Sequence, residues 1–510
     1  MKRNLVLMQP RIGVMDYSGL TATPPLGLLS AASVICREME VRIVDQRAGG
    51  NWRDCLAKSI DAQTVAVGVT SMTGSMILYA LDMAREARRH TKAPIIWGGI
   101  HTSLVPQQTA EHELADYAVE GEGDMALAEL VRRIAAGADT AGIPGVWSKV
   151  NGKVACTPRA QLLDMDTLPP TPYHLIDAEQ YIQIYQGQRA LFYQTSRGCP
   201  CRCSYCYNLT FNKGRWRSRS AEKILEEMAE LKKRYKLEVM YIWDDNFFID
   251  TKRARTLLAG MKELGLRCML HGADVESLAR MSDSDLDFLE EVGVDTLAIG
   301  VESAVDRVRT EVLNKRGGID LVRAQLERFK GRSIHVGCFF ILGLPTETAE
   351  EIKKTIMFAM DTLDMGPNFH IPQFFNFAPY PGTAIFDRLQ KQGVLFPRKL
   401  EEWGKWEWDY SMIHDANPKI KDLLARITVM GKYIDSNKDP FLTMDPLRRV
   451  VARIYAPVAR ARLRSGILWP MPELWMSRMQ KKLTLRFREF GAVAGGRLRG
   501  AAVVPQKSES

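Results

Sequence analysis

The chain lacks long apolar stretches. No run of about 18 uncharged apolar residues occurs in it, so the sequence predicts no membrane-spanning helix. A few apolar residues follow Lys2 and Arg3, but Gln9, Pro10 and Arg11 interrupt them before the apolar region of a signal peptide could form. The sequence therefore predicts a cytoplasmic protein.

The sequence also lacks the cysteine pattern of a disulfide-stabilised protein. Its nine cysteines are an odd number in a long chain without a predicted signal peptide, which argues against a disulfide framework. Four of them fall between Cys199 and Cys206, and this cluster is the most informative feature of the sequence. The composition, with 46% hydrophobic and 25% charged residues, is that of a globular protein, and 510 residues suffice for two to four domains.

Excess positive charge is absent outside the C-terminal tail. Residues 440–510 hold 14 Lys and Arg against 4 Asp and Glu, a local net charge of +10, whereas the whole chain carries +9. The rest of the chain is thus nearly neutral and gives no reason to expect nucleic-acid binding. In the tail, basic residues alternate with Leu, Phe and Trp, including Trp469 and Trp475. This pattern favours contact with an anionic membrane surface; nucleic acid and a solvated basic helix are the alternatives.

The first 141 residues alternate short apolar runs with helical patterns. Strands separated by helices predict a parallel sheet with crossover helices, a Rossmann-like doubly wound α/β layer. The predicted strands are residues 4–8, 41–44, 65–69, 94–97 and 117–119, and the predicted helices are residues 26–37, 52–62, 76–89 and 125–135. Residues 142–188, rich in Pro and Gly as far as Pro172, are predicted to form a linker.

A second alternating series occupies residues 189–385. Six β/α steps are too few for a closed eight-stranded barrel, so the sequence predicts a partial (β/α)6 barrel with its function at the carboxyl ends of the strands. The predicted strands are residues 190–195, 239–243, 267–272, 296–300, 334–342 and 370–377, and the predicted helices are residues 221–235, 252–264, 282–291, 321–330 and 348–363. Residues 386–510 are predicted to be mainly helical and basic.

Three cysteines follow the first barrel strand with the spacing C-x3-C-x2-C: Cys199, Cys203 and Cys206. One loop can then deliver three thiolates to an iron–sulfur cluster, which leaves one iron of a four-iron cluster free to bind a substrate or cofactor. Zinc bound by these residues and Cys201 is the alternative, but a crowded Cys-x-Cys-x-Cys run fits a tetrahedral site poorly. We interpret Cys201 as lying between ligands.

This loop resembles the signature of the radical S-adenosylmethionine (SAM) superfamily, whose members carry it after the first strand of a partial barrel. The resemblance covers about residues 189–385 and includes Ser196-Arg197-Gly198 before the first cysteine and Tyr205 before the last. It implies a [4Fe-4S] cluster whose open iron binds SAM, and cleavage of SAM to a 5′-deoxyadenosyl radical. It also implies an external electron donor such as flavodoxin or ferredoxin.

Later strand ends agree with this resemblance. Asp244-Asp245-Asn246 closes the second barrel strand, where carboxylate and amide oxygens can accept hydrogen bonds from the SAM ammonium group. A solvated strand end or a helix cap is the alternative for this segment. The fourth strand ends in a segment that resembles the family's ribose-binding segment. The fifth ends at a glycine that lets the backbone approach the ligand. The sixth ends in a segment that resembles the family's adenine-covering segment. By this resemblance the SAM-binding residues are Tyr205, Asp244, Asp245, Asn246, Glu302, Ser303, Gly343 and Pro379.

Small and hydroxylic residues follow the strands of the first predicted sheet. At the carboxyl ends of parallel strands they form a crevice in which a large ligand can lie against the backbone. No G-x-G-x-x-G follows the first strand, which disfavours a dinucleotide site. The layout resembles the cobalamin-binding domain that precedes the barrel in a subgroup of radical SAM enzymes. By this resemblance the cobalamin-binding residues are Asp45, Arg47, Gly50, Thr70, Ser71, Thr73, Gly98, Gly99, His101, Glu120 and Gly121.

One position departs from that resemblance. Cobalamin domains that ligate cobalt from below use Asp-x-His-x-x-Gly, and here Asp45, Arg47 and Gly50 occupy this frame without a histidine. We therefore expect no histidine ligand at this position; a domain that keeps the fold without the cofactor is the alternative. For His101, contact with the corrin and capping of the next helix both remain open.

Together the two resemblances imply a cobalamin-dependent radical SAM C-methyltransferase. The radical would abstract hydrogen from an unactivated carbon, and methylcobalamin would supply the methyl group. The tail favours a hydrophobic small-molecule substrate, and the sequence identifies no catalytic side chain. The alternatives are an oxidative cyclase or ring-rearranging enzyme with the same cofactors, acting on a tetrapyrrole or natural product, and, from another class, a non-catalytic cluster and corrinoid sensor.

Overall fold

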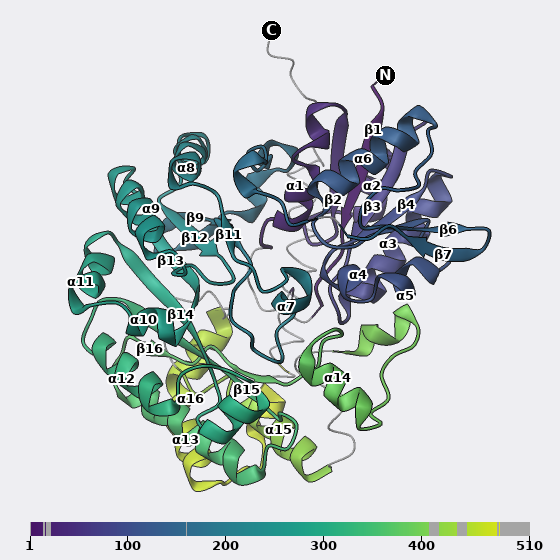
Figure 1. Ribbon diagram of the computed structural model, residues 1–510. Helices are drawn as coiled ribbons and strands as arrows, with labels where there is room; N and C mark the ends of the chain where they lie inside the picture. Colours follow the sequence, from purple (N-terminus) through teal and green to yellow (C-terminus); the bar gives the residue numbers. More distant parts are fainter. Residues whose placement is uncertain are drawn as a thin grey trace.

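The computed structural model describes residues 2–13, 16, 22–159, 161–406, 418–435, 446–476 and 479. Two largely parallel sheets, each covered by helices, dominate the architecture (Figure 1). The first sheet has the order β2-β1-β3-β4-β5-β6-β7, and β1 to β5 run parallel, as the sequence predicted. These five strands are β1 Asn4–Gln9, β2 Glu40–Asp45, β3 Thr64–Thr70, β4 Ile95–Gly98 and β5 Tyr117–Val119.

Helices cover both faces of this sheet because its strands are apolar on both sides. In β1, Val6 and Met8 face one core, and Leu5 and Leu7 face the other. The helices are α1 Leu26–Ala32, α2 Trp52–Ser59, α3 Met76–His90, α4 Ile100–Leu104, α5 Pro106–Glu111 and α6 Gly123–Ala136. The strand order places a crevice at the carboxyl ends of β1 and β3, where successive connections leave in opposite directions.

Part of the predicted linker belongs to the first sheet. Strands β6 (Val146–Val150) and β7 (Lys153–Cys156) form an antiparallel hairpin that extends the sheet beyond β5. Asn151 and Gly152 connect them with positive φ angles of 51° and 74°. This two-residue connection suits the twist of a hairpin. The linker prediction for residues 142–188 is therefore wrong for this stretch.

The second sheet is the predicted partial barrel, with the order β16-β15-β14-β13-β12-β9-β8. Strand β8 (Gln183–Tyr185) is antiparallel to β9, and the other pairs are parallel. The sixth predicted strand is interrupted: β16 and β17 both pair with β15, and Pro372, which has no N–H to donate, lies between them. The parallel strands are β9 Gln188–Tyr193, β12 Val239–Trp243, β13 Arg267–Ala273, β14 Val294–Glu302, β15 His335–Leu342, β16 Phe369–His370 and β17 Phe374–Asn376.

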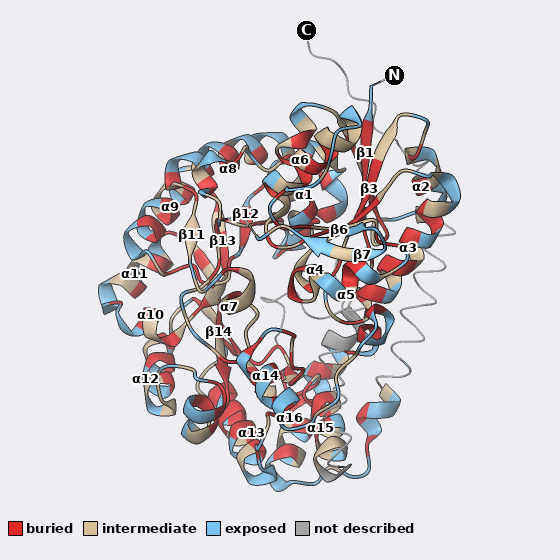
Figure 2. Cartoon of the chain, turned by 45° about the vertical axis from the view of Figure 1, so that its right-hand side comes forward, coloured by how far each residue is buried: buried red, intermediate tan, exposed pale blue. Residues whose placement is uncertain are grey.

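Five long helices cover the outside of the barrel, and their solvent faces are the exposed outer surfaces in Figure 2. Alternate strand residues such as Met240 and Ile242 point outward into the core under these helices, while Tyr241 points into the barrel. The helices are α8 Ala221–Tyr235, α9 Thr251–Glu263, α11 Asp283–Glu291, α12 Ile319–Phe329 and α13 Ala349–Asp364. Shorter elements of this part of the chain are α7 Asn208–Phe211, which lies between the barrel and the first domain (Figure 1), α10 Val275–Ala279 and a π-helical turn at Val308–Val312.

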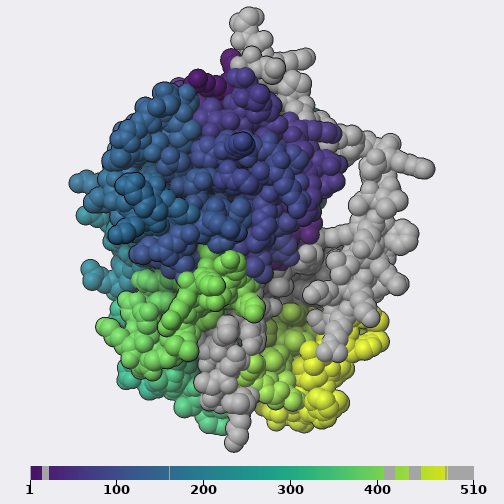
Figure 3. Space-filling model, turned by 90° about the vertical axis from the view of Figure 1, so that its right-hand side faces the viewer, coloured from purple at the N-terminus to yellow at the C-terminus, as the bar shows by residue number. Residues whose placement is uncertain are grey.

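The chain after the barrel packs on both domains. Helix α14 (Ala384–Lys391) and the 3-10 helix Leu400–Lys405 lie against the first domain (Figure 3), where Phe386, Trp403 and Trp406 join the core that contains α3. Helices α15 (Pro418–Met430) and α16 (Pro446–Ser465) pack on the barrel. Residues 480–510 of the basic tail lie outside the described residues. Among the helices that the structure describes, none has the length and apolar character needed to cross a bilayer.

Candidate functional site

Asp244 organises the start of the cysteine loop. The loop leaves β9 through Thr195 and the two-residue strand β10 (Ser196–Arg197). The buried Asp244 carboxylate accepts hydrogen bonds from both backbone N–H groups and both hydroxyls of Thr195 and Ser196, at 2.5 to 3.2 Å. Four protein donors fill its accepting capacity. Asp244 thus anchors the loop, and its contact with SAM stays a prediction.

Asp245 and Asn246 hold the loop farther along. The Asp245 carboxylate accepts from the backbone N–H of Gly198 at 2.8 Å and from the hydroxyl of Tyr207 at 3.3 Å, one on each side of the cysteines. The amide nitrogen of Asn246 donates to the sulfur of Cys199 at 3.6 Å and to Asp274 at 2.7 Å. The three residues at the end of β12 therefore fix the cysteine loop.

Cys199, Cys203 and Cys206 lie on this loop and are partly buried. Hydrogen bonds from the thiol and backbone N–H of Cys201, and from Asn246, lower the pKa of the Cys199 thiol to about 7 against the effect of burial. Burial raises the pKa of Cys206 to about 12. In the described part of the chain, no three His, Cys, Asp or Glu side chains surround a single metal ion site. Thiolates that each bind a different iron of a cluster need not converge in this way.

Glu302 closes β14 beside the loop. Its Oε1 accepts from the Tyr205 hydroxyl at 2.9 Å and from Nζ of Lys315 at 3.3 Å. Burial lowers the pKa of Lys315, but Glu302 and Cys203 outweigh this effect, so its pKa is raised and it stays charged. Glu302 has a φ of +69°, a strained conformation for a non-glycine residue that is typical of functional sites. Lys315 was not predicted, because no motif distinguishes it in the sequence.

Three other predicted SAM-binding residues have contacts of different kinds. The Ser303 hydroxyl is 3.3 Å from that of Thr355 on α13, so it faces the helices. The backbone N–H of Gly343 donates to the buried Glu347 at 2.7 Å. The carbonyl of Pro379 accepts from the indole of Trp406 at 2.9 Å. Gly343 and Pro379 lie beyond the ends of the fifth and sixth strands, as predicted, whereas the Ser303 side chain points away from them.

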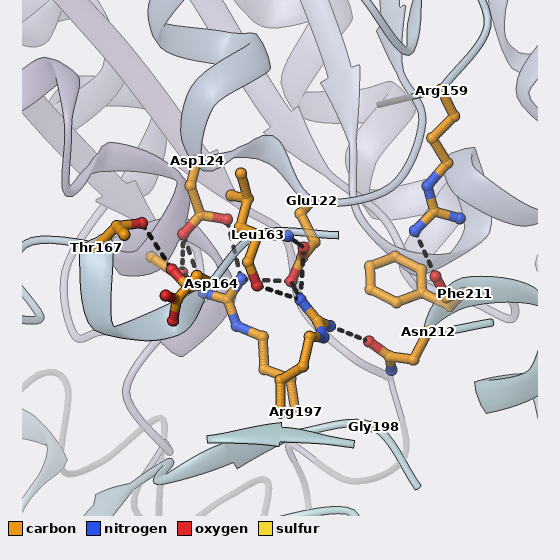
Figure 4. Close-up of polar contacts among 12 residues, drawn as sticks. Glu122, Asp124, Arg159, Leu163, Asp164, Thr167, Arg197, Gly198, Phe211 and Asn212 are labelled. Carbon is orange, nitrogen blue, oxygen red and sulfur yellow. Dashed lines mark hydrogen bonds and ion pairs between the residues drawn. The ribbon is translucent and has the colours of Figure 1, made fainter. Parts of the chain in front are cut away.

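Arg197 joins the cysteine loop to the first domain (Figure 4). Its guanidinium donates to Glu122 at 2.7 Å and to the two oxygens of Asp124 at 2.9 and 3.1 Å. Arg217, its register partner on the two-residue strand β11 (Arg217–Ser218), donates to Glu122 at 2.9 Å. The carboxylates are 6% and 3% exposed and lie at the beginning of α6. Because unpaired buried charges are costly, this four-residue network, the Arg197 network, requires the two domains to be docked.

Asp45 and Arg47, the predicted cobalamin-binding residues at the end of the second strand, form an ion pair with each other. Arg47 forms a bidentate ion pair with Asp45, with distances of 2.7 and 3.0 Å, and donates to the carbonyl of Thr23 at 2.9 Å. Asp45 also accepts from the hydroxyl of Tyr181 at 2.9 Å. The arginine that occupies the histidine position of this frame is thus held by the Asp45 carboxylate and the Thr23 backbone carbonyl.

The carboxyl edge of the first sheet has open space at three glycines. A Cβ atom placed on Gly49, Gly50 or Gly98 would meet no atom within 4 Å. Gly99 differs, because its φ is +94° and a Cβ there would lie 2.6 Å from the Ser71 carbonyl and the Thr70 hydroxyl. The edge is therefore accessible to a ligand at the ends of β2 and β4 and closely packed beside β3.

Three predicted cobalamin-binding residues, Ser71, Thr73 and His101, have partners within the first domain. Ser71 is buried and bonds to Thr102 at 3.0 Å, and Thr73 bonds to Nδ1 of His101 at 2.9 Å. Burial lowers the pKa of His101 to about 3, and its ring lies edge-on to Trp403, so it lines the domain interior. Its Nε2 is buried without a hydrogen-bond partner among the described residues.

Glu120 and Gly121 after β5 also have contacts within the protein. Glu120 accepts from the indole of Trp147 on β6 at 2.9 Å. Gly121 has a φ of +88°, and a Cβ there would overlap the guanidinium of Arg159, which donates to the carbonyl of Thr210 at 3.3 Å. Glycine at this position therefore lets Arg159 reach the barrel side, a contact that the sequence did not reveal.

The comparisons with known proteins agree with this geometry. The family model of the radical SAM superfamily matches residues 193–359, and that of the B12 binding domain matches residues 18–131. The uncharacterized methyltransferase PH0819 of Pyrococcus horikoshii is 30% identical, over 84% of this chain and 91% of its own length. The chain belongs to the cobalamin-dependent radical SAM family. It is a radical SAM enzyme, and the cofactors of the family are a [4Fe-4S] cluster, SAM and cobalamin.

Solved structures share the fold. The chain resembles OxsB, described as a cobalamin-dependent SAM radical enzyme, with a TM-score of 0.68 and 15% identity over 91% of this chain and 72% of that chain. It also resembles the radical SAM methyltransferase TsrM of Kitasatospora setae, with a TM-score of 0.62 and 19% identity over 77% and 75% of the two chains. The doubly wound sheet followed by a partial barrel is confirmed by these likenesses.

The first prediction concerns the cysteines. Cys199→Ala, Cys203→Ala and Cys206→Ala should each lose most of the cluster iron, because each removes a thiolate ligand. Cys201→Ala should keep the iron and lose only one hydrogen bond to Cys199. Iron and sulfide analysis after anaerobic reconstitution measures both. Loss of iron from Cys201→Ala, with iron retained in the other three variants, would contradict the assignment.

The second prediction concerns the Arg197 network. Glu122→Gln leaves the guanidinium groups of Arg197 and Arg217 without their shared carboxylate and should destabilise the folded chain by about 3 kcal/mol. Glu129→Gln, on the same helix but in an exposed pair with Arg133, should cost less than about 1 kcal/mol. Urea unfolding followed by circular dichroism compares them. Adding Arg217→Gln should restore part of the loss; equal stability of Glu122→Gln and Glu129→Gln would refute this account.

Proposed function

We propose that the chain transfers a methyl group to an unactivated carbon of a small, hydrophobic substrate. The Arg197 network is the observation that carries the proposal, since it holds the cysteine loop of the barrel against the strand-end loops of the first domain. A reaction that uses the cofactors of both domains needs both sites open to one substrate. When bound, the cluster supplies the electron that cleaves SAM, and cobalamin carries the methyl group.

The residues at the carboxyl end of the barrel fit a cluster and SAM. Cys199, Cys203 and Cys206 would hold the cluster, and an external donor such as flavodoxin or ferredoxin would reduce it. Both contacts that the described residues make to the Glu302 carboxylate use Oε1, which leaves Oε2 to accept from the ribose hydroxyls of SAM. Lys315 forms an ion pair with this carboxylate and holds it in place.

The carboxyl edge of the first sheet fits cobalamin. The open glycines Gly49, Gly50 and Gly98 would let a flat macrocycle approach the backbone. Arg47 occupies the position of the histidine ligand and is bound to Asp45 and Thr23, which supports cobalamin binding without a histidine from this loop.

A cyclase is the second candidate function. The anaerobic magnesium-protoporphyrin IX monomethyl ester cyclase of Rubrivivax gelatinosus is 26% identical over 65% of this chain and 59% of its own length. The same cofactors would then remove hydrogen and close a ring without methyl transfer. The substrate of either reaction would occupy the same lumen of the barrel.

The third prediction tests these functions. Anaerobic incubation of the reconstituted enzyme with reductant, methyl-deuterated SAM and cell extract should yield 5′-deoxyadenosine and a metabolite that carries the labelled methyl group, both detected by mass spectrometry. Cys203→Ala should yield neither. A metabolite that loses a pair of hydrogens and gains no label would favour the cyclase and contradict methyl transfer.

We also propose that the enzyme contacts membranes through α16. Val450, Ile454 and Val458 are spaced four residues apart on one face of this helix and are 55%, 78% and 48% exposed. Trp469 and Trp475 farther along are also exposed. An exposed apolar stripe beside a basic segment is typical of an interfacial helix. Because Ala459 and Leu463 of the same helix are buried against the barrel, its outer face can be tested by substitution without removing the helix.

The fourth prediction concerns this α16 stripe. Val450→Ser/Ile454→Ser/Val458→Ser should bind anionic vesicles at least about tenfold more weakly than the unmodified chain in co-sedimentation, because three side chains can no longer be buried in lipid. Added salt should weaken the binding of both proteins. Val150→Ser/Ile184→Ser/Leu395→Ser, which changes three exposed side chains elsewhere, is the matched control and should bind normally. Equal binding of the two variants, or binding of nucleic acid in place of vesicles, would contradict the proposal.

A further inference from the structure

Aromatic rings from neighbouring strands form a continuous surface inside the barrel, here called the aromatic wall. It consists of Trp243, His271, Phe339 and Phe375. Trp243 and His271 are register partners on β12 and β13, with ring centroids 4.5 Å apart and an interplanar angle of 3°. His271 meets Phe339 edge-on at 5.7 Å, and Phe339 stacks on Phe375 at 6.0 Å.

The wall faces the barrel interior, and its rings are exposed toward the carboxyl ends of the strands. Below Trp243, the rings of Phe192 and Tyr241 belong to an inner core that is separate from the core beneath the helices. Those two rings are fully buried, whereas Trp243 at the end of β12 is 40% exposed. His271, Phe339 and Phe375 are half-buried. The exposed ring surface thus begins where the strands approach the cysteine loop.

Strand β14, which lies between β13 and β15, contributes small residues to this side. Its inward positions next to the wall are Ala298 and Gly300, so the rings of His271 and Phe339 can meet across it. A Cβ atom on Gly300 would overlap the carboxylate of Glu302. Ala298 and Gly300 therefore place no large side chain of their own in front of the wall, and the Glu302 carboxylate of the same strand lies over Gly300.

The wall itself carries no formal charge. Burial lowers the pKa of His271 to about 4, so its imidazole is neutral near pH 7. The nearest carboxylates at the rim, Asp245 and Glu302, accept hydrogen bonds from protein groups. Trp243 and His271 stack face to face on each other and present ring edges to the lumen, so a flat aromatic ring lying over these edges makes edge-to-face contacts that a puckered ring cannot make.

We propose that the aromatic wall binds a flat, uncharged, aromatic or conjugated part of the substrate, with Trp243 and Phe375 at the two ends of the contact. This inference rests on the proposed function in placing the substrate in the barrel. The proposal adds that the hydrophobic substrate is planar in the part that contacts the wall. The ring nitrogens of His271 supply a hydrogen-bonding group at the middle of an otherwise apolar surface.

The fifth prediction uses 2-naphthol and decahydro-2-naphthol, which share one skeleton and differ in planarity. The reconstituted enzyme with cluster, cobalamin and SAM, in the Val450→Ser/Ile454→Ser/Val458→Ser background that removes the α16 stripe, should bind 2-naphthol about tenfold more tightly than its saturated counterpart. Trp243→Leu should reduce this preference to threefold or less, and Trp243→Phe should retain most of it. Equilibrium dialysis measures each dissociation constant.

A second variant and a control keep the test independent of folding. Phe375→Leu, at the other end of the wall, should lower the same preference, while Trp475→Leu on the exposed surface should leave it unchanged. Iron and corrinoid content confirm that each variant is intact. An unchanged preference in both Trp243→Leu and Phe375→Leu, or equal binding of the two probes to the starting protein, would overturn the proposal. Because no turnover is measured, absence of methyl transfer would leave this result unaffected.

Discussion

The ion pairs of Arg197 with Glu122 and Asp124 are the interaction on which the arrangement of the two domains depends. Arg197 stands two residues before Cys199, and its partners stand at the beginning of α6 in the other domain. Burial disfavours the charged guanidinium, but Asp124 and Glu122 outweigh this effect and raise its pKa. The two carboxylates also lie at the N-terminal end of α6, where the partial positive charge of the helix dipole attracts them. The same ion pairs therefore dock the two domains and position the cysteine loop.

The end of β12 completes this preorganisation from the barrel side. Asp244, Asp245 and Asn246 hold, in order, the start of the loop, its backbone at Gly198, and the sulfur of Cys199. Their order along the strand end is the same as the order of these partners along the loop. A loop fixed at several points presents its thiols in one geometry before any ligand binds, which lowers the conformational cost of binding.

The sequence predicted the parts of the structure that depend on local pattern. All five parallel strands of the first sheet and the six strand positions of the barrel were found, because apolar runs separated by helices are a strong signal. The β6–β7 hairpin was missed although Asn151-Gly152 is a typical hairpin turn, since its strands are largely exposed and lack apolar alternation. The sixth strand was predicted as continuous, and Pro372 was the overlooked signal.

The sequence placed the predicted site residues at strand ends, but it did not reveal their contacts within the protein. Strand ends could be predicted to gather at one edge, but no sequence pattern shows that Asp244 has all four accepting positions filled by its neighbours. Ion pairs between residues that are far apart in the sequence could not be predicted either. Lys315 with Glu302, and Arg217 with Glu122, join residues 13 and 95 positions apart through the tertiary fold alone.

The packing of Phe386, Trp403 and Trp406 on the first domain has a consequence for biosynthesis. These side chains complete a core whose other members, on β1, β3 and α3, are translated about 300 to 400 residues earlier. The nascent first domain consequently emerges from the ribosome with one face of apolar surface uncovered. It stays so until the whole barrel has been synthesised, and the barrel core is completed later still by α15 and α16, so both domains acquire their final packing only from residues that follow the barrel strands.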